Sequence, residues 1–292
     1  MNASETQKVI LLADSGGSKT DWVLLDGATV LSQLQTPGLN PSLVGPEMIR
    51  MVLKEQVQPW MMGKSPRECW FFGAGLTRKT PKNRMRKLLR TQLQLSGKIA
   101  VEPDILGAGY ACLGKAKGLV GILGTGSVAF RFNGKKITDK KGGLGYLIGD
   151  VGGGVALGRT FLRRLVNKDL PKVILDSYPH YSGISINSVL ETLYSHVAPA
   201  RFLAAQVPFL ALHRKDPVLS KIIMEQFEGF LEVYLGSLIE EVDEQVVFMG
   251  GVARTFGSEL IQICKEKGIP NAKIHRDPPI KALTVFFGNR EI

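Results

Sequence analysis

The sequence has no apolar stretch long enough to cross a membrane, which takes about 20 residues. The first eight residues are polar and contain no signal-peptide core. We therefore expect a cytoplasmic protein without a membrane partner.

Cysteine and histidine are also scarce. The three cysteines, Cys69, Cys112 and Cys264, show no CxxC or Cys/His spacing, which argues against a zinc site and against disulfides. The four histidines form no ligand or triad spacing. We expect buried, reduced thiols and assign no role to histidine.

Acidic residues are outnumbered, with 26 Asp and Glu against 37 Lys and Arg and a net charge of +11. Such an excess suits an anionic substrate or nucleic acid. The densest basic stretch, 78–90, is interrupted by apolar residues at helical spacing, which indicates an amphipathic helix with Thr80 as its N-cap. No nucleic-acid module is recognisable, so we expect no nucleic-acid partner.

The first glycine-rich turn, Asp14 to Thr20, lies between apolar runs at 9–13 and 22–25. A strand therefore follows the turn, whereas a Rossmann or P-loop turn leads into a helix. Asp14 could hold a hydrated Mg²⁺. Backbone and side-chain donors for a phosphate are expected at Gly16, Gly17, Ser18, Lys19 and Thr20. The alternative is an ordinary glycine-rich hairpin.

The same order returns later in the chain. Strands are predicted at 119–123 and 128–132 around a second glycine turn, Gly124-Thr125-Gly126-Ser127, followed by a strand at 135–139. In the first half the third strand is predicted at 30–35. Two phosphate turns, one in each half, would clamp a nucleotide.

Helices and further strands separate these turns. The patterns predict helices at 46–62, 80–95, 105–113, 155–166, 217–241, 255–267 and 279–287, and strands at 70–74, 99–101, 245–249 and 272–275.

Four other places in the sequence are candidates for catalysis or binding: two single residues, a glycine pair and a glycine-rich stretch. Asp104 follows a strand and begins a helix, where it could act as a general base or simply cap the helix. Asn40, before a proline, could recognise a hydroxyl or only shape a turn. The pair Gly250-Gly251 could admit a flat adenine or ribose, or form a plain turn, and the glycine density of 141–154 indicates close backbone approach.

Four motifs stand in a fixed order: Asp14-Ser-Gly-Gly-Ser-Lys-Thr, Pro103-Asp104, Gly124-Thr-Gly-Ser and Met249-Gly-Gly-Val-Ala. Together they resemble the phosphate-1, connect, phosphate-2 and adenosine motifs of the superfamily of actin, sugar kinases and heat-shock chaperone ATPases. Within it, nearly the whole chain resembles the BadF/BadG/BcrA/BcrD-type ATPases, and most closely their N-acetylglucosamine-kinase-like branch.

The resemblance implies an α/β fold of two RNase-H-like domains, with mixed five-stranded sheets flanking a nucleotide cleft. The domains would be 1–116 with 278–292, and 117–277 with a helical insertion. The activity implied is transfer of a phosphoryl group from ATP, with Mg²⁺, to a hydroxyl of a small amino sugar such as N-acetylglucosamine. The resemblance leaves a homodimer open.

It also implies roles for individual residues. Asp104 would be the catalytic base and a sugar contact, and Asp14 would lie near Mg²⁺. The nucleotide would be bound by Asp14, Gly16, Gly17, Ser18, Lys19, Thr20, Gly124, Thr125, Gly126, Ser127, Gly250 and Gly251. The sugar would be bound by Asn40, Ala74, Gly75, Asp104, Gly143 and Asp150.

Three positions depart from the family pattern. Val128 stands where the family commonly has Asn, Val151 where it has Glu, and Leu144 where eukaryotic members have Trp. The motifs expected to bind ATP match the family pattern, so the departures concern the acceptor. A pocket that loses a hydrogen-bonding partner changes its substrate preference strongly.

Two other functions compete with the kinase. An activase-type ATPase would need cysteines placed for a bridging iron–sulfur cluster, and the three cysteines lie outside the glycine turns. A sensor that binds ATP or sugar without turnover would fit the sugar-side departures, although it would not need both Asp14 and Asp104.

Overall fold

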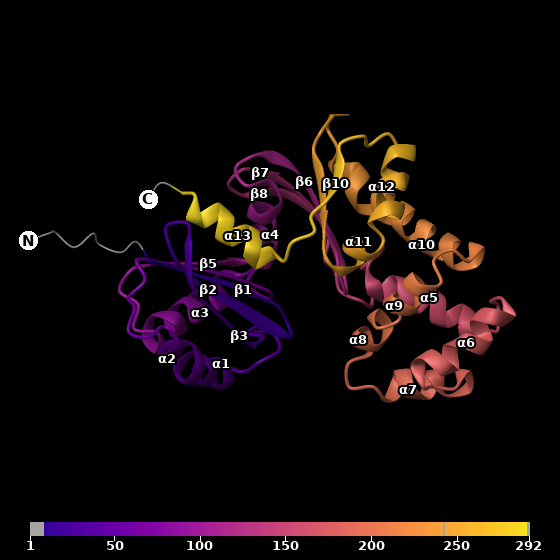
Figure 1. Cartoon of the computed structure of the whole chain (residues 1–292), viewed down its shortest axis with the longest axis horizontal. Coiled ribbons are helices and arrows are strands. Elements are labelled where there is room, and N and C mark those ends of the chain that lie inside the picture. The colour runs from indigo at the N-terminus through magenta and orange to yellow at the C-terminus, as the bar shows by residue number, and fades with distance from the viewer. Residues whose placement is uncertain (1–8, 242, 291–292) are drawn as a thin grey trace, which may run out of the picture. The chain divides into compact units, whose positions relative to one another are not determined.

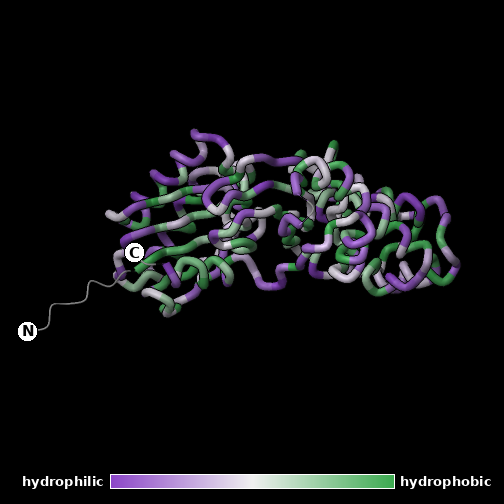
Figure 2. The backbone as a smooth tube through the Cα atoms, turned by 90° about the horizontal axis from the view of Figure 1, so that it is seen from above, coloured by the Kyte–Doolittle hydropathy of each residue, from purple (hydrophilic) through white to green (hydrophobic). Residues whose placement is uncertain are grey.

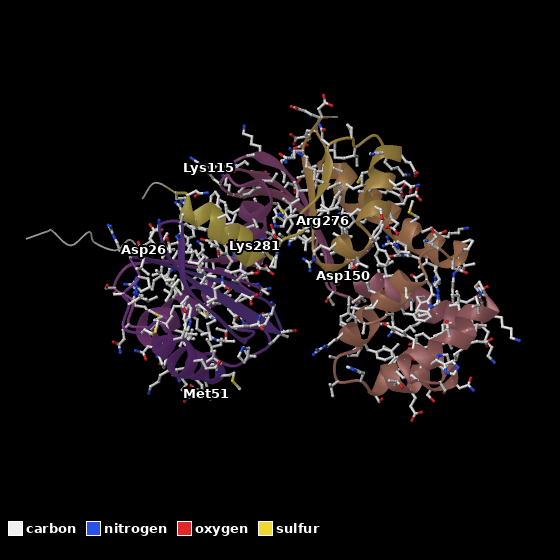
Figure 3. The ribbon with its side chains drawn as sticks, in the orientation of Figure 1. Asp26, Met51, Lys115, Asp150, Arg276 and Lys281 are labelled. Atoms are coloured by element: carbon white, nitrogen blue, oxygen red, sulfur yellow. The ribbon has the colours of Figure 1, made fainter. Side chains whose placement is uncertain are left out.

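The computed structural model describes residues 9–241 and 243–290, which fall into two compact units (Figure 1). Unit 1 contains residues 9–115 and 277–290, and unit 2 contains the rest. The chain leaves unit 1 after Lys115 and returns after Arg276, two residues that are labelled in Figure 3. The crossings predicted from the sequence, 116/117 and 277/278, each differ from these by one residue.

Unit 1 is built on a mixed sheet with the order β3-β2-β1-β4-β5. β1 pairs with β2 in antiparallel and with β4 in parallel orientation, and β4 is parallel to β5. The carboxyl ends of β1, β4 and β5 therefore share one edge. The strands are β1 (Val9–Ser15), β2 (Lys19–Asp26), β3 (Thr29–Pro37), β4 (Glu68–Gly73) and β5 (Lys98–Pro103).

Helices cover both faces of this sheet (Figure 1). Alternate residues of a strand point to opposite faces, so Leu11 and Ala13 pack with α1 and α3, whereas Ile10 and Leu12 pack with α4 and α13. The helical elements are α1 (Pro46–Val52), the π-helix η1 (Leu53–Val57), α2 (Gln58–Trp60), α3 (Lys79–Gln92), α4 (Asp104–Leu113) and α13 (Pro279–Gly288). Figure 2 shows the hydrophobic stretches that the strands contribute.

The last helix, α13, completes the core of unit 1. Its Leu283 and Phe287 are buried against the face that carries Ile10 and Leu12. The Phe287 ring lies 5.0 Å from the Trp70 ring, measured between centroids. Packing of this kind explains why the end of the chain returns to the first unit.

Unit 2 repeats the topology, with the strand order β10-β9-β6-β7-β8. Both sheets are mixed and five-stranded, which confirms the predicted pair of RNase-H-like units. The register shifts in β2/β3 of unit 1 and also in the equivalent pair β7/β8. The strands are β6 (Lys117–Leu123), β7 (Ser127–Asn133), β8 (Ile137–Gly142), β9 (Val246–Met249) and β10 (Ala272–Ile274).

A mostly helical stretch between β8 and β9 enlarges unit 2. Its helices pack into one core with sheet residues such as Leu119, Leu123 and Phe248. The elements of this stretch are α5 (Gly154–Val166), α6 (Lys172–Ser182), η2 (Ile186–Ser188), α7 (Val189–Ser195), α8 (Pro199–Ala204), α9 (Val207–Leu212), α10 (Pro217–Phe230), η3 (Leu231–Leu235) and η4 (Gly236–Leu238). After β9 come α11 (Gly251–Thr255) and α12 (Gly257–Glu266).

Several predicted boundaries were wrong. The basic helix begins at Lys79 with Arg78 as its N-cap, so Thr80 lies inside it. The predicted helix 217–241 is α-helical only to Phe230, after which a π-helix and a 3-10 turn follow. The predicted helix 255–267 begins earlier, at Gly251, and is interrupted at the fully buried Phe256.

The strand predicted at 135–139 begins two residues later than expected. The Asn133 carboxamide oxygen accepts the backbone N–H groups of Lys135 and Lys136, at 3.1 and 3.0 Å. These bonds extend the turn through residue 136. Asparagine side chains commonly compete in this way with the backbone hydrogen bonds between strands.

In the part of the chain that the structure describes, no helix combines the length and apolar character needed to span a membrane.

Candidate active site

The carboxyl edge of the sheet in unit 1 gathers most of the predicted residues. Asp14 lies near the end of β1, Ala74 follows β4, and Asp104 follows β5 as the first residue of α4. The Ala74 N–H donates to the Ser15 carbonyl at 2.9 Å, which fixes the end of β4 against that of β1. Ligands of α/β proteins commonly bind at such an edge.

The first glycine turn is held from inside by a chain of hydroxyls. The Leu39 N–H donates to Ser15 Oγ at 3.1 Å, Ser15 Oγ lies 2.8 Å from Thr20 Oγ1, and Thr20 Oγ1 donates to the Pro37 carbonyl at 3.1 Å. Because a hydroxyl has one proton, Ser15 must donate to Thr20. The Thr20 hydroxyl is fully buried and its proton is used within this chain of bonds, so its contact with phosphate stays a prediction.

Gly38 supports the same turn and was not singled out from the sequence. A Cβ at Gly38 would lie 2.6 Å from the carbonyl carbon and oxygen of Gly17 and 2.7 Å from the Gly16 oxygen. Only glycine allows the two backbone segments to approach this closely. The signal in the sequence was Pro37-Gly38 in a loop, which by itself indicates no more than a turn.

The tip of the turn faces solvent. Gly17, Ser18 and Lys19 are exposed, and the Gly16 N–H is used within the turn, where it donates to the Lys19 carbonyl at 2.9 Å. The Lys19 ammonium pairs with the Asp21 carboxylate at 2.8 Å. This leaves Gly17, Ser18 and a charged Lys19 accessible to an anion.

Asp14 is the electrostatically unusual group of this edge. Burial, together with the negative charges of Asp104 and Asp21, raises the pKa of Asp14 to about 7, and Lys19 opposes the shift. Two carboxylates that lie close enough to repel each other beside a glycine turn form an arrangement suited to a cation or a proton transfer.

Asp104 is held at the start of α4. Its Oδ1 accepts the backbone N–H of the next residue, Ile105, at 2.9 Å. The positive end of the helix dipole favours the ionised carboxylate, as a general base requires. The N-cap position itself belongs to Pro103, so the simple capping role that was the alternative for Asp104 does not describe its position.

The structure brings Asn40 and Gly75 together. A Cβ at Gly75, which has φ +77°, would lie 2.2 Å from Asn40 Oδ1. The same oxygen accepts the Ser42 N–H at 2.9 Å, which shapes the loop that follows β3. Asn40 therefore acts as a turn residue and also lies against Gly75, one of the predicted sugar contacts.

In unit 2 the second glycine turn is fastened to the segment before α5. The Gly154 N–H donates to the Gly124 carbonyl at 2.8 Å, and the Val155 N–H donates to the Thr125 carbonyl at 3.0 Å. Ser127 Oγ donates to the Val151 carbonyl at 2.6 Å. The turn is therefore positioned by backbone groups of a distant segment.

Asp150 is part of this fastening. Its Oδ1 accepts the Ser127 N–H at 3.1 Å, and a Cβ at Gly126 would lie 2.6 to 2.7 Å from the carboxylate oxygens. The residue is only 6% exposed and has φ +64°. The sequence resemblance implied that Asp150 contacts a sugar, whereas its observed contacts are structural ones to the second turn.

The remaining predicted residues of unit 2 lie beside the same turn. The Gly143 N–H donates to the Ser127 carbonyl at 2.8 Å. Gly250, with φ +111°, lies so close to β6 that a Cβ would meet the Leu123 oxygen at 2.2 Å, whereas Gly251 is exposed with open space around it. The glycine pair and the second turn are thus neighbours.

Comparisons with known proteins agree with this arrangement. No family model matches the chain. The chain is 31% identical over 158 residues to the N-acetylmuramic acid/N-acetylglucosamine kinase of Clostridium acetobutylicum, covering 52% of this chain and 51% of that protein. It is 25% identical over 175 residues to the N-acetyl-D-glucosamine kinase of Dictyostelium discoideum, covering 55% of each. These alignments therefore span about half the length of the curated relatives.

A solved structure matches over the full length. The Porphyromonas gingivalis protein named "Putative N-acetylglucosamine Kinase" is 30% identical, with a TM-score of 0.89, and the match covers 97% of this chain and 100% of that one. The chain belongs to the N-acetylglucosamine-kinase-like family.

The departures from the N-acetylglucosamine-kinase-like pattern can now be placed. Val128 is the second residue of β7, beside the second turn, and is buried. Val151 is packed against the core of unit 2. Leu144 is 59% exposed, so an apolar side chain faces solvent where eukaryotic members have Trp.

The cysteines fit a kinase of this family better than an activase. Cys69 and Cys264 are buried and Cys112 is half-buried, and burial raises the pKa of each thiol to about 12. Within residues 9–241 and 243–290, no group of three or more His, Cys, Asp or Glu side chains could hold a metal ion. These thiols are neutral at physiological pH and poor cluster ligands.

Proposed function

We propose that the protein transfers the γ-phosphoryl group of ATP to a hydroxyl of an N-acetylated amino sugar. The observation that carries this proposal is the arrangement of Asp14 and Asp104 at one sheet edge, directly beside an exposed glycine turn. The names of the relatives in Clostridium, Dictyostelium and Porphyromonas support an amino sugar as acceptor. We propose that it works in the cytoplasm.

We propose that Asp104 is the general base. Phosphoryl transfer depends mainly on positioning and charge stabilisation, so one base that removes the proton of the attacking hydroxyl is sufficient. Its place at the start of α4 fixes the carboxylate, which accepts the backbone N–H of Ile105.

The residues present also fit Mg²⁺. Burial and the repulsion from Asp104 and Asp21 raise the pKa of Asp14, and a bound cation would favour its charged form. Mg²⁺ in kinases is commonly held by one or two carboxylates, water and substrate phosphates, which agrees with the lack of a three-ligand cluster in the described chain. Asp14 would hold the ion through water, and the ion would neutralise charge on the phosphates.

Phosphate donors are proposed in each unit. Gly17, Ser18 and Lys19 present backbone and side-chain donors at the tip of the first turn. The second turn offers Thr125 and Gly126, since the Gly124 N–H donates to the Gly126 carbonyl at 2.9 Å. We assign Asp150 to positioning this second turn. Gly250 and Gly251 are proposed to admit the adenosine.

For the acceptor, we propose a contact surface formed by Asn40, Ala74 and Gly75. The Asn40 amide nitrogen can donate to a sugar oxygen while its oxygen shapes the loop, and the absence of a side chain at Gly75 leaves room for the Asn40 carboxamide itself. An Asn40→Asp variant tests this contact, since it keeps the turn and removes the donor.

The function is tested by ADP release from Mg-ATP against a panel of sugars and amino sugars, with wild type beside Asp104→Asn. We expect release that depends on N-acetylglucosamine or a close relative and disappears in the variant, while ADP affinity stays unchanged. Release that ignores every acceptor would favour an ATPase, and nucleotide binding without release would favour a sensor. Either result would overturn the kinase proposal.

A further inference from the structure

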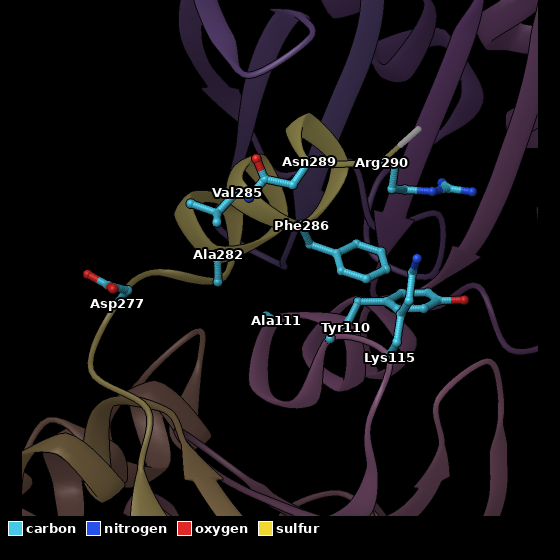
Figure 4. Close-up of a pocket in the computed structure, with 10 residues that line it drawn as sticks. Tyr110, Ala111, Lys115, Asp277, Ala282, Val285, Phe286, Asn289 and Arg290 are labelled. Carbon is cyan, nitrogen blue, oxygen red and sulfur yellow. The ribbon is translucent and has the colours of Figure 1, made fainter. Parts of the chain in front are cut away.

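A cavity of unit 1 lies away from the carboxyl edge, between the end of α4 and α13 (Figure 4). Its volume of about 450 Å³ falls within the range of small-molecule sites. Asp104 begins α4, whereas the cavity is lined by Tyr110, Ala111 and Gly114 near the end of that helix. The cavity is therefore separate from the residues assigned to catalysis.

One wall of this cavity is aromatic and apolar. The Tyr110 and Phe286 rings stack with centroids 4.9 Å apart and planes inclined by 23°. Ala282 and Val285 of α13 extend the apolar lining, and Val285 is 60% exposed. Such a surface binds a planar or apolar group through burial and ring contacts.

The charged groups of the cavity are mainly cationic. Lys115 and Arg290 line it, and Figure 4 shows both on the same side as the two stacked rings. Neither forms an ion pair with any carboxylate among residues 9–241 and 243–290. The lining acid, Asp277, pairs with Lys281 at 2.8 Å, which reduces its ability to neutralise the two cations.

Arg290 is also held in place by aromatic rings. Its guanidinium carbon lies 5.2 Å from the Trp70 ring centroid and 5.0 Å from that of Phe287. A guanidinium oriented in this way loses less conformational freedom when it binds an anion than a free side chain would.

We propose that this cavity binds a small organic anion, in which a carboxylate or phosphate is attached to a planar or apolar group. The anion is recognised by Lys115 and Arg290, and the attached group lies against Tyr110 and Phe286. Neither half of the ligand alone uses both sets of contacts.

The place of the cavity in the chain suggests an effector site. Lys115 is the last residue before the chain leaves unit 1, and Asp277 is the first after it returns, so an occupant touches both connections. It also touches the helix that begins with Asp104. The effect on catalysis rests on the proposed function, whereas binding does not.

Binding is tested by titration calorimetry with phenyl phosphate, with phenol and inorganic phosphate as the separate halves. The protein is first saturated with Mg-ADP, which occupies the proposed phosphate turns. We expect one phenyl phosphate per chain, bound at least about tenfold tighter than either half, because loss of a charged contact or of ring burial costs about this factor. An equal affinity for phosphate and phenyl phosphate would overturn the proposal.

Variants locate the site. Lys115→Gln with Arg290→Gln should weaken phenyl phosphate at least about tenfold. The matched control, Lys87→Gln with Arg90→Gln, removes the same charge from exposed positions of α3 on the other face of the sheet and should change affinity less than about twofold. Equal weakening by both pairs would show non-specific attraction and overturn the proposal.

A variant that fills the cavity tests the site without changing its charge. Ala282→Phe should fill the cavity and abolish binding while the melting temperature stays near that of wild type. Unchanged binding in this variant would overturn the site. Phenyl phosphate should also alter acceptor-dependent ADP release in wild type and not in the Lys115→Gln/Arg290→Gln protein. Absence of any ADP release would refute the proposed function and leave the binding result intact.

Discussion

The two glycine turns occupy equivalent positions in the two sheets but are held by different chemistry. In unit 1 the turn is held by buried hydroxyls and by the close approach of Gly38, and the nearby acid, Asp14, remains at the functional edge. In unit 2 the turn is held by an acid, because Asp150 accepts a backbone N–H and packs against Gly126.

This difference shows how one topology can serve two tasks. A carboxylate that is bonded within its own unit contributes to stability. A carboxyl group whose pKa is raised by burial and by other acids lowers the stability of the folded protein. Such a group is typical of a functional site, where a ligand needs it. Removing the carboxylate of Asp104 should therefore affect the reaction, whereas removing that of Asp150 should affect mainly folding.

The largest effect is expected from the carboxylate of Asp104. Asp104→Asn should lower the rate of acceptor-dependent ADP release by about 10²- to 10⁴-fold, because a general base contributes about this much. Asp150→Asn, which keeps an acceptor oxygen and tolerates a positive φ, should stay within about tenfold of wild type. Single-turnover rates at saturating Mg-ATP compare the two variants. Equal losses of rate would contradict the different roles assigned to Asp104 and Asp150.

The second prediction concerns Asp14 and pH. Its pKa is raised to about 7 in the folded protein, so the folded state binds the proton more tightly than the unfolded chain. Stability from this group is complete below pH 4 and is lost as pH rises through 7. Asp14→Asn should therefore stabilise the metal-free protein above pH 7 by up to about 4 kcal/mol.

Thermal unfolding in EDTA at pH 5 and pH 8 measures this difference. The gain in melting temperature of Asp14→Asn over wild type should be larger at pH 8. Asp150→Asn serves as the comparison and should give no such gain. A gain for Asp14→Asn that is the same at both pH values would contradict the assigned cause.

The third prediction concerns the support of the first turn. Gly38→Ala should destabilise the protein by about 3 kcal/mol, since its Cβ would meet backbone atoms that cannot move independently. Gly124→Ala in the second turn meets no atom within 4 Å and should cost less than about 0.5 kcal/mol. Urea unfolding compares the two, and similar costs would mean that the turns do not differ in their support.

The smallest effect separates two contributions of Asp150. Asp150→Gly removes the carboxylate but suits the positive φ, and should cost about 2 kcal/mol. Asp150→Ala also places a Cβ in the left-handed region and should cost about 1 kcal/mol more. If the alanine variant is as stable as the glycine variant, backbone conformation plays no part at this position.

Much of the fold could be predicted because its signals are local. Apolar runs bounded by glycine turns identified nearly every strand, and the repeated order of strand, turn and strand indicated two similar units. Asp104 was placed correctly at the join of β5 and α4 because a strand, a Pro-Asp step and a small-residue helix follow each other directly in the chain.

The rest depended on contacts between distant residues. The buried Thr20 hydroxyl and the Asp150 carboxylate look like ligand contacts in the sequence, and only the positions of Pro37 and Ser127 show that they are used internally. The role of Gly38 depends on a neighbouring turn. The break at Phe256 reflects burial of that ring, 6.1 Å from the ring of Phe227, which no helical pattern reveals.

The return of α13 to unit 1 has a consequence for biosynthesis. The strand that carries Ile10 and Leu12 leaves the ribosome well before Leu283 and Phe287, which cover it. Unit 2 is continuous in sequence and can complete its core earlier. Synthesis of unit 1 therefore starts before that of unit 2 and is completed after it, and until then part of one apolar face of its sheet is open to chaperones or to aggregation.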